Sequence, residues 1–133
     1  MLIIRMTDYN YGMKREYETL KVLQNKFGKD IKKTFGKYNR FDFINADTLI
    51  ELKSRRCSVN TYPDTMVGLN KLEYAKKHPD KQVIFCFNFN EGLYYHKYTS
   101  DKEYSIRQGG RNDRGKAEIK SYFFINSTDL TKV

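Results

Sequence analysis

Residues 40–53 decide the fold, and they read Arg-Phe-Asp-Phe-Ile-Asn-Ala-Asp-Thr-Leu-Ile-Glu-Leu-Lys. Two short apolar runs, Phe41–Ile44 and Thr48–Leu52, flank the polar sequence Asn45-Ala46-Asp47. Short apolar runs on both sides of a turn sequence are typical of a β-hairpin. We therefore predict a hairpin here, centred on the Ala-Asp step of the turn.

The predicted register gives the hairpin two chemically different faces. Counting outward from the turn places Asp42 directly opposite Glu51, with Lys53 one pleat further along the same face. Because side chains alternate along a strand, the other face is apolar and belongs against a core. Its members are Phe41, Phe43, Ile50 and Leu52.

The polar face has the composition of a metal site. Directly opposed side chains have Cβ atoms roughly 5 Å apart, and like charges at that distance destabilise a sheet. Two carboxylates so placed suit a divalent cation such as Mg²⁺, which binds one or two carboxylates plus waters. A lysine beside the cation helps to place and deprotonate a water and to neutralise a phosphate under attack.

Asp42 on one strand and Glu51-Leu52-Lys53 on the next resemble the motif of the PD-(D/E)XK nuclease superfamily. Acid-x-Lys also occurs at Asp30–Lys32 and Glu118–Lys120, but only the middle copy has an acid paired with it across a turn. Asn39-Arg40-Phe41 stands where the family name records a proline, which is often missing in such enzymes. The motif alone is equally compatible with an ordinary surface hairpin whose solvent face is charged.

The first helix is predicted over Met13–Phe27, with Gly28 as its C-terminal stop. At 100° per residue, Glu16 falls with the apolar side chains of this helix, whereas Glu18 points toward solvent. A carboxylate on an inward stripe is costly unless it is paired or bound to metal. One explanation is a salt bridge at the margin of the stripe, for which Arg40 is a partner to consider. The other comes from the resemblance, because PD-(D/E)XK nucleases commonly carry an acid on this helix.

The resemblance implies metal-dependent hydrolysis of phosphodiester bonds. Asp42 and Glu51 would hold Mg²⁺, for which Mn²⁺ can substitute, and the Leu52 backbone carbonyl would be a further ligand. Glu16 would serve directly or through a water. Lys53 would orient the attacking water and stabilise charge. The implied catalytic set is therefore Glu16, Asp42, Glu51 and Lys53.

Charge points to nucleic acid as the partner. The chain has 25 basic and 16 acidic residues and a formal net charge of +9, which suits a polyanion. A basic connection follows Lys53, and a helix is predicted from Pro63-Asp64-Thr65 to about Lys77. A second basic loop follows Thr99. The expected contacts are Arg55, Arg56, Tyr62, Lys71, Arg107, Arg111, Arg114 and Lys116, and a solvated or disordered loop is the alternative for each loop residue.

The remaining elements complete an α/β fold. Gln82–Phe89 is almost continuously apolar and predicts a central strand covered on both faces. Leu93–Tyr98 and Ile119–Ile125 predict further strands. The element order matches the restriction-endonuclease-like fold, a mixed β-sheet flanked by two helices. We expect residues 1–133 to form a single domain with one core.

The two cysteines, Cys57 and Cys86, lack metal-ligand spacing and do not suggest a disulfide framework. No apolar run approaches membrane-spanning length and Met1–Asn10 lacks a signal-peptide pattern, so we expect an intracellular protein that is not secreted. The resemblance favours a structure-directed DNA endonuclease, of the Holliday-junction-resolvase or viral nuclease kind, with DNA favoured over RNA and dimer formation left open. The alternatives are a non-catalytic nucleic-acid-binding module on the same fold and a basic protein-interaction domain.

Overall fold

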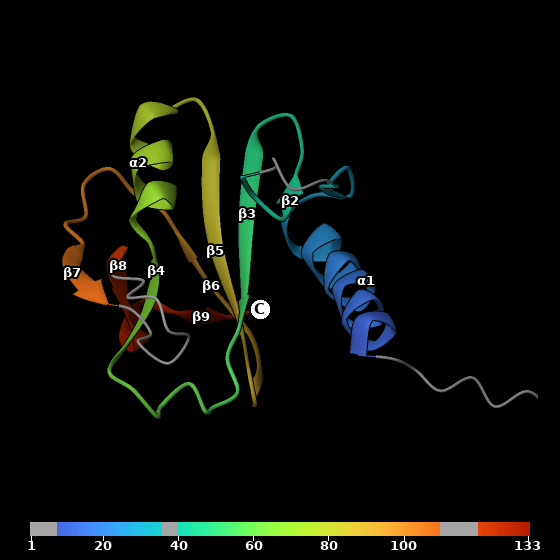
Figure 1. Ribbon diagram of the computed structural model, residues 1–133. Coiled ribbons are helices and arrows are strands. Elements are labelled where there is room, and N and C mark those ends of the chain that lie inside the picture. The colour runs from blue at the N-terminus through green and yellow to red at the C-terminus, as the bar shows by residue number, and fades with distance from the viewer. Residues whose placement is uncertain (1–7, 36–39, 110–119) are drawn as a thin grey trace, which may run out of the picture.

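A computed structural model describes residues 8–35, 40–109 and 120–133 of the chain. These residues form two α-helices, nine strands and one 3₁₀ turn (Figure 1). In chain order they are α1 (Asp8–Phe27), β1 (Lys32–Lys33), β2 (Phe43–Ile44), β3 (Thr48–Ser54), β4 (Asp64–Gly68), α2 (Leu69–Lys77), β5 (Gln82–Phe89), β6 (Gly92–Lys97), β7 (Ser105–Gly109), β8 (Lys120–Asn126), η1 (Ser127–Asp129) and β9 (Thr131–Lys132). Neither described helix is long and apolar enough to cross a membrane.

The main sheet has six strands in the order β1-β2-β3-β5-β6-β9. Its centre is the parallel pair β3–β5, and every other pairing in it is antiparallel. Parallel neighbours need a long crossover, and here β4 and α2 provide it. A second, antiparallel sheet has the order β4-β8-β7. The mixed sheet flanked by helices confirms the predicted α/β, restriction-endonuclease-like class.

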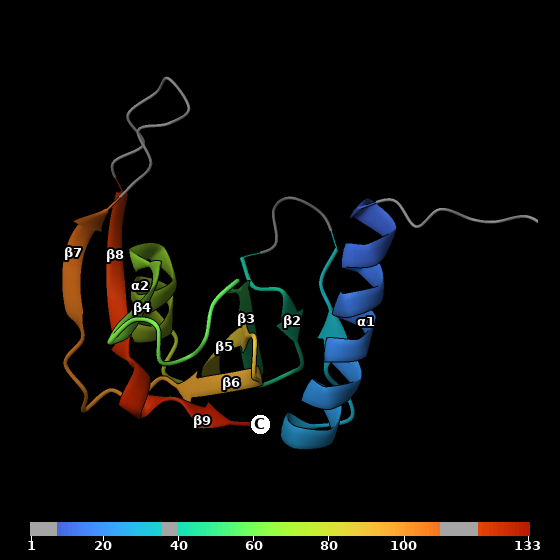
Figure 2. The ribbon, with the colours of Figure 1, turned by 90° about the horizontal axis from the view of Figure 1, so that it is seen from below.

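The six-stranded sheet is the middle of three layers (Figures 1 and 2). Helix α1 covers one face, where Leu23 packs in a cluster with Ile50 and Ile84. Helix α2 and the three-stranded sheet cover the other, where Leu72 packs in a cluster with Phe85 and Phe123. Because both faces are covered, β5 can be apolar at almost every position, as its sequence predicted.

The stop of α1 is also as predicted. The Gly28 N–H donates to the Gln24 carbonyl at 3.1 Å, and Gly28 has φ +145°, a conformation that L side chains rarely adopt. The chain then turns directly into Ile31, which is fully buried beneath α1.

Two expectations about the second half of the chain were wrong. The segment Asp64–Gly68 does not begin a helix but is strand β4, paired with β8. Within it Thr65 and Val67 are buried, while Met66 is 40% exposed, the alternation of a strand. The region after Thr99 is not wholly a loop, because Ser105–Gly109 forms β7 against β8.

The hairpin register is confirmed near the turn and wrong beyond it. Phe43 pairs with Ile50 and Ile44 with Leu49, as predicted. The regular pairing then stops, because the Asp42 N–H also bonds to the Ile50 carbonyl, at 3.0 Å. This one-residue slip moves Phe41 to the opposite core from Phe43, since a slip reverses the faces of a strand. The predicted cross-strand pairs Asp42–Glu51 and Phe41–Leu52 are therefore not part of the ladder.

Candidate active site

Asp42 lies where β2 parts from β3 and is held by backbone on both sides. Its carboxylate oxygen Oδ2 accepts the Leu52 N–H at 2.8 Å. Its carbonyl accepts the Thr34 N–H at 2.9 Å. Because this carboxylate bonds to a backbone N–H of β3, it lies at the edge of that strand. From there it borders both faces of the sheet.

Glu51 is the central group of the site. It lies in the middle of β3 and is only 6% exposed. The Lys53 Nζ lies 3.4 Å from its Oε1, and the Lys71 Nζ lies 3.4 Å from its Oε2. Burial raises the pKa of Glu51, and the charge of Asp42 raises it further, while the two lysines lower it. Two carboxylates and two ammonium groups thus share one partly dry site.

Lys71 comes to this cluster from α2. Its side chain is 16% exposed, and its Nζ also lies 4.9 Å from the centroid of the Phe41 ring. We expected Lys71 to contact nucleic acid; here it contacts the buried acid. Leu72 and Ala75 form the buried stripe of the helix. The position of Lys71 next to this stripe is the one feature of the sequence that indicates an inward-facing side chain. The displaced Phe41 ring, which supports the ammonium group, could not be foreseen from the ideal register.

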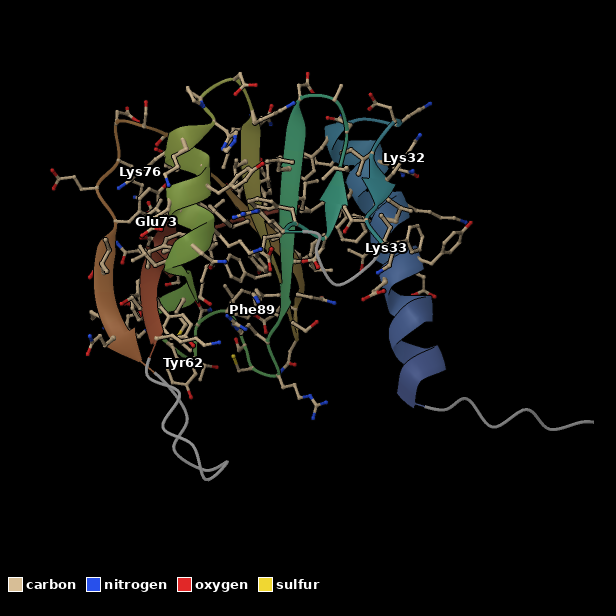
Figure 3. All side chains as sticks on the ribbon, turned by 45° about the horizontal axis from the view of Figure 1, so that its top comes forward. Lys32, Lys33, Tyr62, Glu73, Lys76 and Phe89 are labelled. Atoms are coloured by element: carbon tan, nitrogen blue, oxygen red, sulfur yellow. The ribbon has the colours of Figure 1, made fainter. Side chains whose placement is uncertain are left out.

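Glu16 does not join the cluster directly. It ion-pairs with Lys33 of β1, and 44% of its side chain is exposed (Figure 3 labels Lys33 beside α1). A salt bridge at the margin of the stripe is therefore present, with Lys33 in place of Arg40. Glu16 nevertheless lines the same groove as Asp42, a cavity of about 770 Å³. Glu18 is exposed, as predicted.

The other seven expected nucleic-acid contacts fall into three groups. Arg56 is exposed and lines the groove of Glu16 and Asp42. Arg55 lines it too, but its guanidinium donates to the Met66 carbonyl at 2.7 Å and to Thr65 Oγ1 at 3.3 Å, and burial lowers its pKa. Beyond the groove, Tyr62 is 63% exposed, and Arg107 ion-pairs with Asp64 on the small sheet. The remaining three, Arg111, Arg114 and Lys116, lie outside the described residues.

The donor set fits a hard divalent cation. Asp42 and Glu51 supply carboxylate oxygens from adjoining positions, and such ions take one or two carboxylates with waters completing the shell. The described residues contain no group of three or more His, Cys, Asp or Glu that could hold a metal. A cation here would therefore rely on this pair, on the Leu52 carbonyl and on water. It would offset the repulsion between the two carboxylates, which adds to the effect of burial in raising the pKa of Glu51.

The raised pKa of Glu51 gives a prediction about stability. The folded protein holds the Glu51 proton more tightly than the unfolded chain, whose ordinary value is 4.5. The free energy of unfolding therefore falls as the pH rises from the pKa of the unfolded chain through the higher pKa of the folded protein. Below the pKa of the unfolded chain, Glu51 is protonated in both states and this loss of stability is absent. In EDTA near pH 7, we expect Glu51→Gln to unfold at a higher urea concentration than the parent protein, by circular dichroism. The difference should shrink near pH 4. A variant that is less stable at pH 7 would show that the two lysines outweigh burial.

The comparisons with known proteins assign the chain to a family. A family model described as "phage putative PDDEXK endonuclease" matches residues 8–133. No curated protein and no solved structure matches the chain. The matched span includes both helices and both sheets. It also includes Asp42, Glu51, Lys53 and Lys71. The chain therefore belongs to this family, and through it to the PD-(D/E)XK nuclease superfamily.

Proposed function

We propose that the protein is a metal-dependent endonuclease that hydrolyses phosphodiester bonds in DNA. The observation that carries the proposal is Glu51, a carboxylate that is 6% exposed, lies beside Asp42 and is paired with Lys53 and Lys71. Burying an acid next to a second acid costs free energy. Carboxylates with a shifted pKa are common at catalytic centres, where such a costly arrangement serves the reaction.

Asp42 and Glu51 are the residues that would hold the metal, with the Leu52 carbonyl as a third protein ligand. The superfamily generally uses divalent ions, and the all-oxygen donor set favours Mg²⁺, with Mn²⁺ as a substitute. When bound, such an ion acidifies water and neutralises charge on a phosphate. The hydrogen bond from the Leu52 N–H fixes the Asp42 carboxylate before any ion arrives.

The two lysines have different roles in this proposal. The side chain of Lys53 is 40% exposed, so its ammonium group can reach a substrate phosphate and a water. It would orient that water and stabilise the charge that develops on the phosphate oxygens. Lys71 is more deeply buried and supported by the Phe41 ring. It would hold the Glu51 carboxylate in place without contacting the substrate.

The groove of Glu16, Asp42 and Arg56 is the proposed path of the DNA backbone toward the edge of β3, where Asp42 lies. Glu51 and Lys53 project from the opposite face of β3 and do not line this groove. Its residues are polar where the acids lie, and Arg56 supplies positive charge next to them. Glu16 would act there through a water. By analogy with Holliday-junction resolvases and viral nucleases, recognition of DNA structure is favoured over recognition of sequence.

The direct test is cleavage by the parent protein and by Lys53→Ala. We expect the parent protein to cut DNA in Mg²⁺ and to be inactive in EDTA. Lys53→Ala should lose about 10²- to 10³-fold in rate, because removing one group that stabilises a developing oxyanion costs that much. Its DNA affinity, measured by gel shift in Ca²⁺, should change little, since the role of Lys53 belongs to the transition state.

Lys97→Ala is the control, because Lys97 is exposed on β6, two strands away from β3, and does not line the groove. An active Lys53→Ala protein would contradict the mechanism. DNA binding by a parent protein that cuts no branched, duplex or single-stranded DNA in Mg²⁺ or Mn²⁺ would support the non-catalytic binding module instead.

Glu16 and Glu18 provide a matched pair on one helix. Glu16 lines the groove of Asp42, whereas Glu18 does not. We expect Glu16→Gln to reduce the cleavage rate about 10- to 100-fold, as loss of an outer-shell partner of a metal typically does. Glu18→Gln should leave the rate unchanged. The Glu16–Lys33 pair is part-exposed and contributes at most about 1 kcal/mol, so both variants should melt close to the parent. Equal rates for the two variants would remove Glu16 from the site.

A further inference from the structure

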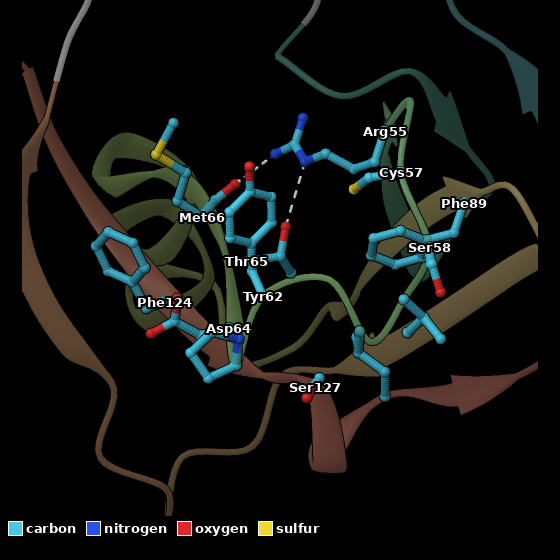
Figure 4. A pocket seen from close by; sticks show the side chains of 13 residues that line it. Arg55, Cys57, Ser58, Tyr62, Asp64, Thr65, Met66, Phe89, Phe124 and Ser127 are labelled. Carbon is cyan, nitrogen blue, oxygen red and sulfur yellow. Dashed lines mark hydrogen bonds between the residues drawn. The ribbon is translucent and has the colours of Figure 1, made fainter.

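A second cavity lies beside the groove of Glu16, Asp42 and Arg56 and differs from it in chemistry. It has a volume of about 430 Å³ and lies between the loop that follows β3 and the three-stranded sheet. Figure 4 shows Tyr62, Met66, Phe89 and Phe124 around it. Its lining is mainly apolar, and its volume is in the range of small-molecule sites, which are apolar pockets with a few fixed polar groups.

The two cavities adjoin. Arg55 and Phe89 line both of them. Arg55 follows β3 directly, two residues after Lys53, and its N–H bonds to the Asn88 carbonyl at 2.9 Å. Figure 3 shows Tyr62 and Phe89 at the same end of the molecule. A strand lying in the polar groove would therefore run beside the wall that the two cavities share.

We propose that this cavity takes one unpaired base of the nucleic-acid strand in the groove, so that the substrate must carry a single-stranded segment. The proposal rests on the proposed nuclease function for the occupant of the groove. A base has apolar faces that pack on aromatic and aliphatic side chains. In a duplex those faces are covered by neighbouring bases, so the pocket can receive only a base that has left the stack.

Tyr62 supplies the stacking surface. It is 63% exposed although it lines an apolar cavity, so a base laid on it would cover surface that now faces water. The Phe124 ring is already covered on one side by the Arg107 guanidinium, 3.5 Å from its centroid. Stacking of a base on an aromatic side chain contributes about 1–3 kcal/mol and tolerates any base.

Arg55 gives the cavity a fixed polar wall. Its bonds to Thr65 and to the Met66 carbonyl hold the guanidinium plane in place (dashed in Figure 4). A planar guanidinium can stack on a base or donate to its edge. Because it also borders the groove, the same side chain can contact the phosphate that precedes the base.

The test compares three probes of equal length by fluorescence anisotropy, with Ca²⁺ in place of Mg²⁺. They are a single-stranded oligothymidylate, an abasic strand with the same phosphates, and a blunt duplex. We expect the parent protein to prefer the oligothymidylate over the abasic strand. Tyr62→Ala should weaken oligothymidylate binding about 5- to 150-fold, the equivalent of one stacked base. Its affinity for the abasic strand and for the duplex should change less than twofold.

Tyr17→Ala is the matched control, because Tyr17 is 60% exposed on α1 and lines neither cavity. It should leave all three affinities unchanged. Equal affinity of the parent protein for the oligothymidylate and the abasic strand would overturn the inference. An equal loss of affinity for all three probes in Tyr62→Ala would also overturn it. The readout is binding, so it is separate from cleavage. If the protein prefers the oligothymidylate over the abasic strand but never cuts DNA, the nuclease function is refuted and the base pocket is supported. If it cuts DNA but binds the two strands equally, the base pocket is refuted and the nuclease function is supported.

Discussion

The buried carboxylate of Glu51 is the constraint on which the site depends. A charge that is 6% exposed must have partners, and the fold supplies two lysines from different elements, each 3.4 Å away. One is two residues along the same strand and the other arrives on the crossover helix. Asp42 opposes this balance, because its charge raises the pKa of Glu51 further. A divalent cation beside the two carboxylates would offset this repulsion.

The architecture explains how these groups meet. The parallel pairing of β3 with β5 requires a crossover, and α2 lies in that crossover over the face from which Glu51 and Lys53 project. The same arrangement buries Leu72 and Ala75 and brings Lys71 inward with them. On the other face, α1 packs through Leu23 and carries Glu16 to the groove. Asp42 links the two faces, because its carboxylate lies at the edge of β3.

The sequence predicted the parts of this fold that depend on periodicity. Strand β5, the end of α1 at Gly28 and the hairpin near its turn follow from apolar patterning and turn residues. The slip at Asp42 does not, because it depends on one extra bond to the Ile50 carbonyl and on the bond from Leu52 to the carboxylate. Strand β4 was also missed. Its alternation covers only five residues, and Pro63-Asp64-Thr65 carries the ordinary signals of a helix start.

Asp42, Glu51 and Lys53 lie near one another, as the sequence predicted, but Asp42 and Glu51 are not the directly opposed pair of the ideal register. Their role as a metal and catalytic site stays a prediction. We expected Lys71 to contact nucleic acid, but in the structure it contacts Glu51. The packing of α2 against the sheet decides which of the polar side chains of the helix face β3, and the sequence does not specify that packing. The apolar cavity had no sequence signal, since it is built from a loop, β4 and β8 together.

The central claim is that Asp42 and Glu51 together hold a divalent cation. Calorimetric titration with Mn²⁺ tests it most directly, using the parent protein, Asp42→Ala, Glu51→Ala and, as control, Asp80→Ala at an exposed turn. The account predicts saturable binding by the parent and the control, and affinity at least about tenfold weaker in each of the two site variants, because neither carboxylate suffices alone. Equal Mn²⁺ affinity in all four proteins, or none in the parent, would contradict it.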